Sequence, residues 1–163
     1  MRFLDASYSE TLSNMAWEIC EPYYRDKVDR TLLKHYLDTF QSKEAIFEQI
    51  SEMGYLYSMI TDESGETVGY FALCHKGDVL FLSKFYIEER FRGKGFGSGT
   101  LDEIFEYGRS LGFRCVQLQA NRNNTPSIEI YKAKGFIVVA TDDSDIGNGI
   151  HVDDLVMEYD LQE

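Results

Sequence analysis

Apolar residues recur through the first third of the chain at the three- and four-residue spacing of a helix that buries one face. Leu12, Met15 and Ile19 follow this spacing. Pro22 has no backbone N–H, so we expect it to interrupt this helix. The elements predicted in this part of the chain are a strand over residues 2–6 and helices over residues 12–20, 31–40 and 43–53.

The rest of the chain alternates between strand and helix patterns. Segments rich in aromatic and β-branched residues predict three strands, which short polar turns join into an antiparallel meander. A helix with an apolar face follows and stops at Gly112, and a second helix begins at Thr125-Pro126 and stops at Gly135. The predicted strands cover residues 55–62, 67–74, 79–88, 115–121, 136–140 and 152–161.

These elements predict an α+β fold in α/β/α layers, with helices on a central, mixed and largely antiparallel sheet of about seven strands. The length of 163 residues is typical of one domain, and no repeat or linker divides the chain. We therefore expect a single domain over residues 1–163. Hydrophobic residues make up 44% of the chain and charged residues 27%, which excludes a disordered protein.

The chain is acidic, with 16 Lys and Arg against 28 Asp and Glu and a net charge of −12. A nucleic-acid-binding protein needs a basic face, so we expect no nucleic-acid partner. An acidic field attracts cationic partners, although acidity that only confers solubility is an equal alternative. No apolar stretch approaches ~20 residues and no signal peptide is visible, so we expect a cytoplasmic protein without a membrane partner. The three cysteines lack metal-ligand spacing, and no metal site is predicted.

A glycine-rich turn over residues 90–99 joins a predicted strand to a predicted helix. Its alternating glycines let the backbone approach a ligand without Cβ clashes, and Arg90, Arg92 and Lys94 add positive charge. Amides that precede a helix form a nest for an anion, most simply a pyrophosphate. A flexible turn with solvated basic side chains is the alternative. Thr100 and Glu103 resemble a capping box, which predicts a helix start one turn later than an anion site prefers.

Two motifs, in this order, resemble those of the N-acetyltransferase family known as GNAT. The segment Arg92-Gly93-Lys94-Gly95-Phe96-Gly97 matches the family's acetyl-CoA loop, Gln/Arg-x-x-Gly-x-Gly/Ala. The second motif is an Asn, a short helix, a Tyr and Gly-Phe, here Asn124, Tyr131 and Gly135-Phe136. The resemblance covers residues 2–161 and is most specific over residues 55–136.

Within the family, the chain resembles one branch, the PaiA type, more closely. The helical N-terminal third, the strand end Phe85-Tyr86-Ile87 and the segment at residues 149–157 are similar to it. This branch includes spermidine/spermine acetyltransferases, whose cationic substrates fit an acidic chain. The similarity is loose around Ser83 and Lys84, which leaves the substrate open.

The resemblance implies a sheet splayed at its central strand, and transfer by direct attack of an amine on acetyl-CoA. The main chain of Phe85, Tyr86 and Ile87 would bind pantetheine and polarise the thioester carbonyl. Asn124 would bind the pantetheine arm, and Tyr131 would contact the coenzyme and protonate the departing thiolate as the catalytic acid. Core packing of Phe85, Ile87 and Tyr131 and a helix-start role for Asn124 stay open. The implied acetyl-CoA loop residues are Arg92, Gly93, Lys94, Gly95, Phe96, Gly97 and Ser98.

The sequence gives the least information about the site that would bind the amine. We expect Glu21, Tyr23 and Tyr24 to form a substrate wall at the helix break, with cation–π contacts from the tyrosines. Asp153 and Asp154 belong to a late acidic region that would hold a polyamine, or would be only a solvated hairpin. The general base stays open among Glu88, Glu89, His75, His151 and a water chain.

The predicted function is therefore acetyl transfer from acetyl-CoA to a small cationic amine. Acetylation of a protein N-terminus or lysine is an alternative within the enzyme class. A coenzyme A-binding regulatory module without turnover is an alternative outside it. The oligomeric state, including a homodimer, stays open.

Overall fold

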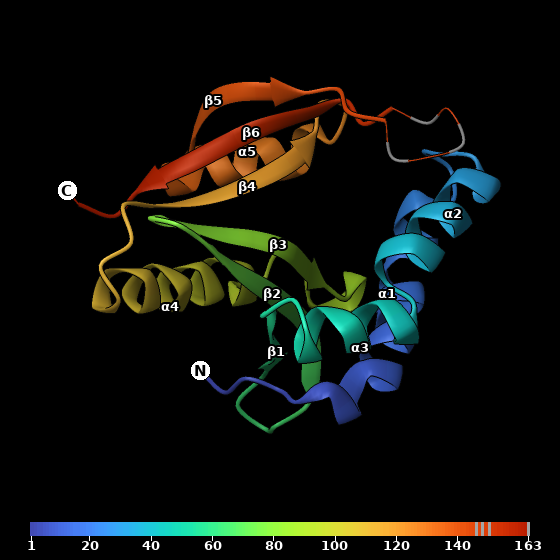
Figure 1. Cartoon of the computed structure of the whole chain (residues 1–163), viewed down its shortest axis with the longest axis horizontal. Coiled ribbons are helices and arrows are strands. Elements are labelled where there is room, and N and C mark those ends of the chain that lie inside the picture. The colour runs from blue at the N-terminus through green and yellow to red at the C-terminus, as the bar shows by residue number, and fades with distance from the viewer. Residues whose placement is uncertain (146, 148, 150, 163) are drawn as a thin grey trace. The chain divides into compact units, whose positions relative to one another are not determined.

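The computed structural model describes residues 1–145, 147, 149 and 151–162, and its strands form one mixed sheet (Figure 1). The six strands follow the order β1-β2-β3-β4-β6-β5. The strands are β1 (Leu56–Thr61), β2 (Thr67–Lys76), β3 (Val79–Ile87), β4 (Cys115–Asn121), β5 (Ile137–Asp142) and β6 (Asp154–Asp160). The helices are α1 (Ser9–Tyr24), α2 (Arg30–Phe40), α3 (Lys43–Ser51), α4 (Phe96–Ser110) and α5 (Thr125–Lys134), with short 3-10 helices at Ala6–Tyr8 and Glu89–Phe91.

The chain divides into two compact units, and β2, β3 and α4 each contribute residues to both. The first unit comprises Met1–Cys74 and Lys84–Thr100, and the second comprises His75–Ser83 and Leu101–Glu163. The first unit thus holds the helical third, β1, most of β2, the end of β3 and the glycine-rich turn. The second unit holds the α5 region and the last strands.

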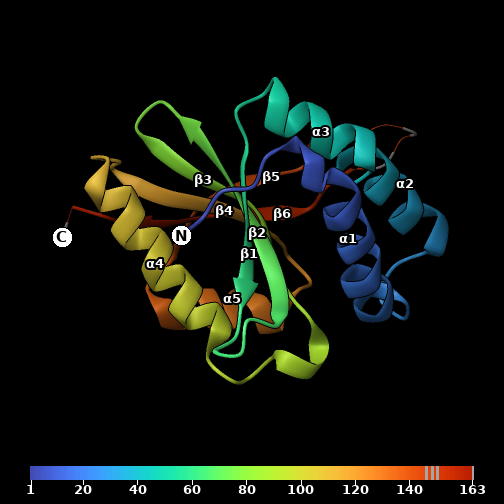
Figure 2. The ribbon, with the colours of Figure 1, turned by 90° about the horizontal axis from the view of Figure 1, so that it is seen from below.

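The core of the first unit lies between the three N-terminal helices and the meander. These helices lie side by side in both views (Figures 1 and 2). Leu12, Leu37 and Ile46 are fully buried, as their helical spacing predicts, and they pack with Tyr57 and Tyr70. The strand β1 pairs antiparallel with β2, with Leu56 opposite Leu73. The strand β3 is the next neighbour of β2 in the sheet, so the predicted order of the three strands is confirmed, together with the antiparallel pairing of the first two.

In the second unit the sheet changes from parallel to antiparallel pairing. The first half of β3 pairs parallel with β4, from Val79 opposite Cys115 to Leu82 opposite Leu118. A parallel neighbour requires a crossover, which α4 provides. The strand β6 then pairs antiparallel with both β4 and β5. The predicted mixed, largely antiparallel sheet is confirmed, and β4 has the predicted bounds.

Two predicted features of the N-terminal part are wrong. Residues 2–6 do not form a strand: the Leu4 amide donates to the Tyr57 carbonyl at 2.8 Å, and a 3-10 helix begins at Ala6. One such bond makes no ladder, so the sheet formed by the described residues has six strands rather than about seven. Pro22 lies inside α1 instead of breaking it. The Arg25 amide donates to the Glu21 carbonyl at 3.0 Å, which closes the last helical turn despite the missing N–H of the proline.

Within the described residues, no helix is both long enough and apolar enough to cross a membrane.

Candidate active site

The glycine-rich turn adopts a backbone that only glycine accommodates well. Gly93 has φ +73° and Gly95 has φ +91°, a region that L side chains rarely adopt. A Cβ built on either glycine meets no atom within 4 Å, so open space lies beside this backbone. The turn therefore has a backbone conformation that favours glycine, with open space beside Gly93 and Gly95.

The helix α4 begins within the motif, at Phe96. The Gly99 amide donates to the Gly95 carbonyl at 3.0 Å, which is a bond of the first helical turn. Thr100 is not an N-cap, since its hydroxyl donates to the Phe96 carbonyl at 2.8 Å. The predicted later helix start is therefore wrong. The helix N-terminus lies where an anion site needs it.

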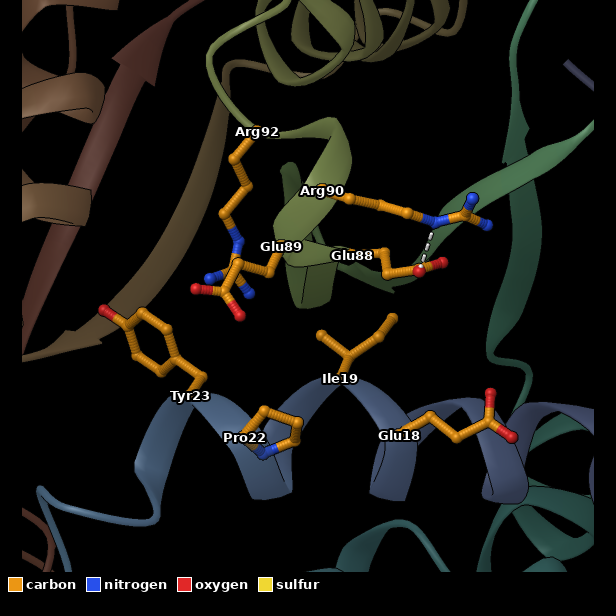
Figure 3. A pocket seen from close by; sticks show the side chains of 8 residues that line it. All are labelled: Glu18, Ile19, Pro22, Tyr23, Glu88, Glu89, Arg90 and Arg92. Carbon is orange, nitrogen blue, oxygen red and sulfur yellow. Dashed lines mark hydrogen bonds and ion pairs between the residues drawn. The ribbon is translucent and has the colours of Figure 1, made fainter.

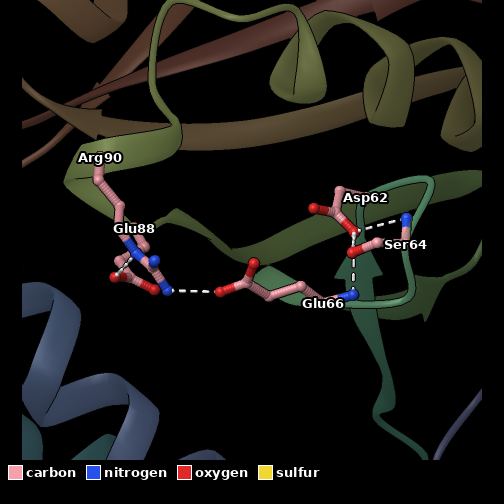
Figure 4. A network of polar contacts seen from close by, with 5 residues as sticks. All are labelled: Asp62, Ser64, Glu66, Glu88 and Arg90. Atoms are coloured by element: carbon pink, nitrogen blue, oxygen red, sulfur yellow. Dashed lines mark hydrogen bonds and ion pairs between the residues drawn. The ribbon is translucent and has the colours of Figure 1, made fainter.

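The three basic side chains of the turn differ in their partners. Arg90 binds Glu88 at 2.6 Å and Glu66 at 2.7 Å (Figure 4). The Glu66 amide in turn donates to Asp62 at 2.9 Å, within the β1–β2 turn. Two carboxylates thus neutralise Arg90, which makes it a poor phosphate ligand, contrary to the expectation from the sequence.

Arg92 and Lys94 have no carboxylate partner among the residues that the structure describes. Arg92 donates through Nε to the Ile87 carbonyl at 2.9 Å, and its guanidinium lies 4.8 Å from the centre of the Tyr23 ring. One main-chain group predicted to bind pantetheine, the Ile87 carbonyl, is thus already bonded. Lys94 is exposed, with its ammonium 5.7 Å from the Phe91 ring, and its charge is available to an anion.

The predicted thioester-binding stretch of β3 lies directly against this turn. A Cβ added to Gly97 would lie 3.8 Å from the Phe85 ring, so the ring packs beneath the start of α4. The Glu88 amide donates to the Val68 carbonyl at 2.8 Å and holds the end of β3 to β2. Phe85, Tyr86 and Ile87 are all half-buried.

A pocket of about 330 Å³ lies between α1 and the segment that follows β3 (Figure 3). In the described part of the chain, Glu18 and Glu89 have no ion-pair partner, whereas Glu88 is paired with Arg90. The pocket thus presents two carboxylates that a cation could use. Its lining residues are Glu18, Ile19, Pro22, Tyr23, Glu88, Glu89, Arg90 and Arg92.

Of the predicted substrate wall, only Tyr23 lines the pocket. Glu21 instead forms a two-point ion pair with Arg25, at 2.9 and 2.7 Å, along its own helix. Tyr24 packs against the hydrophobic core of the first unit. The ammonium of Lys27 lies 4.1 Å from the Tyr23 ring centre, and the Arg92 guanidinium also contacts this ring. Tyr23 already binds two cations of the protein, so the predicted cation–π contact with a substrate has lost its main support.

Asn124 and Tyr131 lie in the second unit, at the start and near the end of α5. Asn124 occupies the N-cap position, but its side chain forms no capping hydrogen bond. Tyr131 is half-buried, and its ring packs edge-on against Phe136 with centroids 5.7 Å apart. Gly135 ends the helix with φ +112°, as predicted. Both alternatives for Tyr131, packing and catalysis, fit this placement.

The late acidic residues have unequal environments. Asp153 forms an ion pair with Arg122 at 3.0 Å and is therefore partly neutralised. Asp154 is half-buried on β6, and burial, together with the charges of Asp142 and Asp153, raises its pKa to about 6. Ile150, which belongs to the segment that resembles the PaiA branch, lies outside the described residues.

The candidates for the general base also differ in the contacts that they make. His75 lies 3.2 Å from the Tyr107 hydroxyl, and His151 lies 3.2 Å from the Asp143 carbonyl. Glu88 is held by Arg90. Glu89 alone among these candidates combines a place in the pocket with no ion pair to the described residues.

Lys84 is a buried cation that sequence reasoning did not single out. Its side chain on β3 is 6% exposed, and its ammonium lies 5.6 Å from the Phe40 ring. No carboxylate pairs with it in the parts of the chain that the structure describes. Burial lowers its pKa to about 8, against smaller opposing effects of Cys74 and Cys20. Its position in an alternating strand, two residues after Leu82, was the available signal.

Replacing Lys84 with methionine should raise the free energy of unfolding at pH 7 by about 3 kcal/mol, because it removes a buried unpaired charge. The folded pKa lies below the unfolded value, so between about pH 8 and pH 10 the unfolded wild type binds more protons than the folded form. Wild-type stability should therefore rise over this window, and the advantage of the variant should shrink. Urea denaturation at pH 7 and pH 9.5 measures both effects.

The exposed Lys34 on α2 provides the control for Lys84. Lys34→Met should change the stability by less than about 0.5 kcal/mol at either pH. A stability gap between wild type and Lys84→Met that does not depend on pH would contradict the assignment of a desolvated ammonium.

Comparison with known proteins places these features in context. The model described as the acetyltransferase (GNAT) family matches residues 12–136. A spermine/spermidine N(1)-acetyltransferase of Bacillus subtilis is 24% identical over 119 residues, which cover 67% of this chain and 78% of that protein. An uncharacterized N-acetyltransferase of Methanocaldococcus jannaschii is 30% identical over 84 residues, which cover 47% of this chain but only 37% of that protein.

Solved structures share the fold over nearly the whole chain. The PaiA N-acetyltransferase of Thermoplasma acidophilum, solved in complex with coenzyme A, has a TM-score of 0.79 at 21% identity, with 98% of this chain and 96% of that chain covered. The ribosomal-protein-S18-alanine N-acetyltransferase of Escherichia coli has a TM-score of 0.72 at 12% identity, with 99% and 93% covered. At these identities the likeness concerns the fold.

Proposed function

Because the chain belongs to the acetyltransferase (GNAT) family, we propose that it transfers an acetyl group from acetyl-CoA to the nitrogen of an amine. The match over residues 12–136 confirms the family resemblance seen in the sequence. The observation that carries the proposed activity is the turn at residues 92–98, whose left-handed glycines and helix start provide room and amides for a pyrophosphate. We assign this activity to residues 1–163 as one domain.

The chain's own residues suit the coenzyme in charge as well as in shape. Lys94 would neutralise a phosphate group, and the first amides of α4 would donate to phosphate oxygens. The main chain of Phe85 and Tyr86 would meet the pantetheine arm and the thioester carbonyl. Asn124, at the N-cap position of α5, would donate to the same arm.

Acetyl transfer by direct attack needs a neutral amine and a protonated leaving group. The amine nitrogen forms a bond to the acetyl carbon as the carbon–sulfur bond breaks, and the sulfur leaves as a thiolate. We assign to the Tyr131 phenol the proton that the thiolate receives. Glu89, or a water bound to it, would accept the proton that the amine loses.

The acceptor that we propose is a small cationic amine such as a polyamine. A net charge of −12 attracts a polycation, and the pocket beside α1 offers Glu18 for a distal ammonium group. Asp154 is a further candidate contact, whereas Glu21 and Asp153 are bound by arginines of the chain itself. The name of the Bacillus relative agrees with this class.

A thiol-release assay with acetyl-CoA should give a higher kcat/KM for spermidine than for neutral monoamines, amino acids or peptides. This advantage should shrink as salt is added, because exposed charges are screened beyond ~8 Å at physiological ionic strength. Changing Glu18 to glutamine should lower kcat/KM for spermidine by about fivefold and leave acetyl-CoA affinity unchanged. Glu63→Gln, in the exposed β1–β2 turn, is the matched control and should have no effect.

The other functions give different results in the same assay. Preference for peptides over polyamines would favour the protein acetyltransferase alternative. Binding of acetyl-CoA without turnover on any amine would favour the regulatory module. Polyamines that are inert at low salt would reject this acceptor class and leave acetyl transfer in place.

A further inference from the structure

The side chain of Tyr86 faces the N-terminal helices and is bonded to them. Its hydroxyl lies 3.4 Å from Nε2 of Gln41, the C-cap residue of α2, and 3.3 Å from the hydroxyl of Tyr36, which lies within α2. The Tyr86 hydroxyl also bonds to the Cys20 thiol on α1. Burial has the largest effect on the pKa of this thiol and raises it to about 12, whereas the bond to Tyr86 acts in the opposite direction. The strand predicted to hold the thioester is thus attached to two helices through one phenol.

The orientation of the Gln41 amide is determined by a third tyrosine. The Tyr70 hydroxyl donates to Gln41 Oε1 at 2.9 Å, so the NH₂ group of Gln41 is directed to the Tyr86 oxygen. Gln41 and Tyr70 are both 0% exposed. Water cannot replace a lost bond there, so breaking this chain leaves a polar group unsatisfied. We call Tyr36, Gln41, Tyr70 and Tyr86 the Tyr86 network.

The neighbouring strand β2 confines the backbone of Tyr86. A Cβ on Gly69 of β2 would overlap the Tyr86 carbonyl oxygen and lie 3.1 Å from Ile87 Cα. No side chain therefore separates β2 from the Tyr86–Ile87 peptide. The Glu88 amide, bonded to the Val68 carbonyl at 2.8 Å, holds the next residue in place. Tyr86 is thus held by the hydrogen bonds of its side chain on one side and by the close approach of β2 to its backbone on the other.

We propose that Tyr86 is a positioning residue, whose phenol, held by Gln41 and Tyr36, sets the position of the β3 main chain that receives acetyl-CoA. The inference rests on the proposed function and adds to it a role for a side chain and for the α2 helix. Phe85 packs under the start of α4, so the adjacent residues Phe85 and Tyr86 link β3 to the glycine-rich turn and to the helical core, respectively. Small displacements of such a main chain are costly, because thioester binding depends on hydrogen-bond geometry.

Tyr86→Phe should raise both the Kd and the KM for acetyl-CoA about tenfold, because the ring stays but the bonds that locate the strand are lost. The matched control is Tyr57→Phe on β1, which removes a phenol bonded to Gln49 in the same core. It should lose comparable stability and keep acetyl-CoA affinity within twofold. This contrast separates positioning of β3 from general weakening of the core. Calorimetry with acetyl-CoA, steady-state kinetics and urea denaturation supply the readouts.

A double-mutant cycle tests whether Gln41 acts through Tyr86. Gln41→Leu and Tyr86→Phe should weaken acetyl-CoA binding less together than the product of their separate effects. If Tyr86→Phe does not fold, Tyr36→Phe, which removes a half-buried partner, should raise the Kd about threefold. Wild-type affinity in a folded Tyr86→Phe or Tyr36→Phe, or multiplicative effects in the cycle, would overturn this inference alone. A wild type that does not bind acetyl-CoA would overturn the proposed function, and the inference with it.

Discussion

A protein in which Gly95 is replaced by valine should stay folded and lose measurable binding of acetyl-CoA. Gly95 has φ +91°, and a β-branched residue cannot adopt this conformation without strain. Relieving the strain would turn the neighbouring amides away, and the new side chain would occupy the open space beside the turn. We expect the Kd measured by calorimetry to rise by about 100-fold or more.

Gly65→Val is the matched control for this experiment. Gly65 has φ +87° and also meets no atom within 4 Å of a built Cβ, but it lies in the β1–β2 turn. The two variants should therefore lose similar stability, while only Gly95→Val loses the coenzyme. Unchanged acetyl-CoA affinity in a folded Gly95→Val protein would refute the assignment of the turn.

Tyr131→Phe should lower kcat by about 100-fold or more and leave the affinity for acetyl-CoA nearly unchanged. The substitution keeps the ring that packs against Phe136 at 5.7 Å and removes only the phenol. A general acid that acts in the transition state affects turnover rather than ground-state binding. Rapid-quench measurement of the chemical step, together with calorimetry, tests both statements.

Tyr159→Phe is the control for the loss of a phenol in the same unit. The Tyr159 hydroxyl lies 3.3 Å from Arg109, and its ring stacks on Phe105. Its removal should affect stability but not the chemical step. If Tyr131→Phe retains the wild-type rate of chemistry, Tyr131 has a packing role and another group protonates the thiolate.

Several features of this protein follow from short segments of its sequence. The alternation of Val116 and Leu118 with glutamines predicted β4 with the observed bounds, and Pro126 and Gly135 marked the two ends of α5. The glycines of the turn at residues 92–98 were recognisable because positive φ angles restrict the residue type at each position separately. Local backbone preference therefore determined most elements and the conformation of the glycine-rich turn.

The two failures near the N-terminus have different causes. A Pro near the end of a helix removes one bond while later bonds still close the last turn, so Pro22 did not mark a break. An apolar segment such as residues 2–6 becomes a strand only if a neighbour supplies a ladder. The sequence by itself could not show that only one bond would reach β1.

The sequence by itself determined the family, the order of the elements and the turn that suits a pyrophosphate, because these depend on residue types within a few positions. Only the tertiary structure decided which charges remain available. Arg90 is neutralised by Glu66, and Lys84 is buried without a carboxylate among the described residues. Only the tertiary structure showed that Tyr86 bonds to Gln41, 45 positions away. Burial and charge pairing depend on which distant residues the fold brings together, and no local pattern encodes those partners.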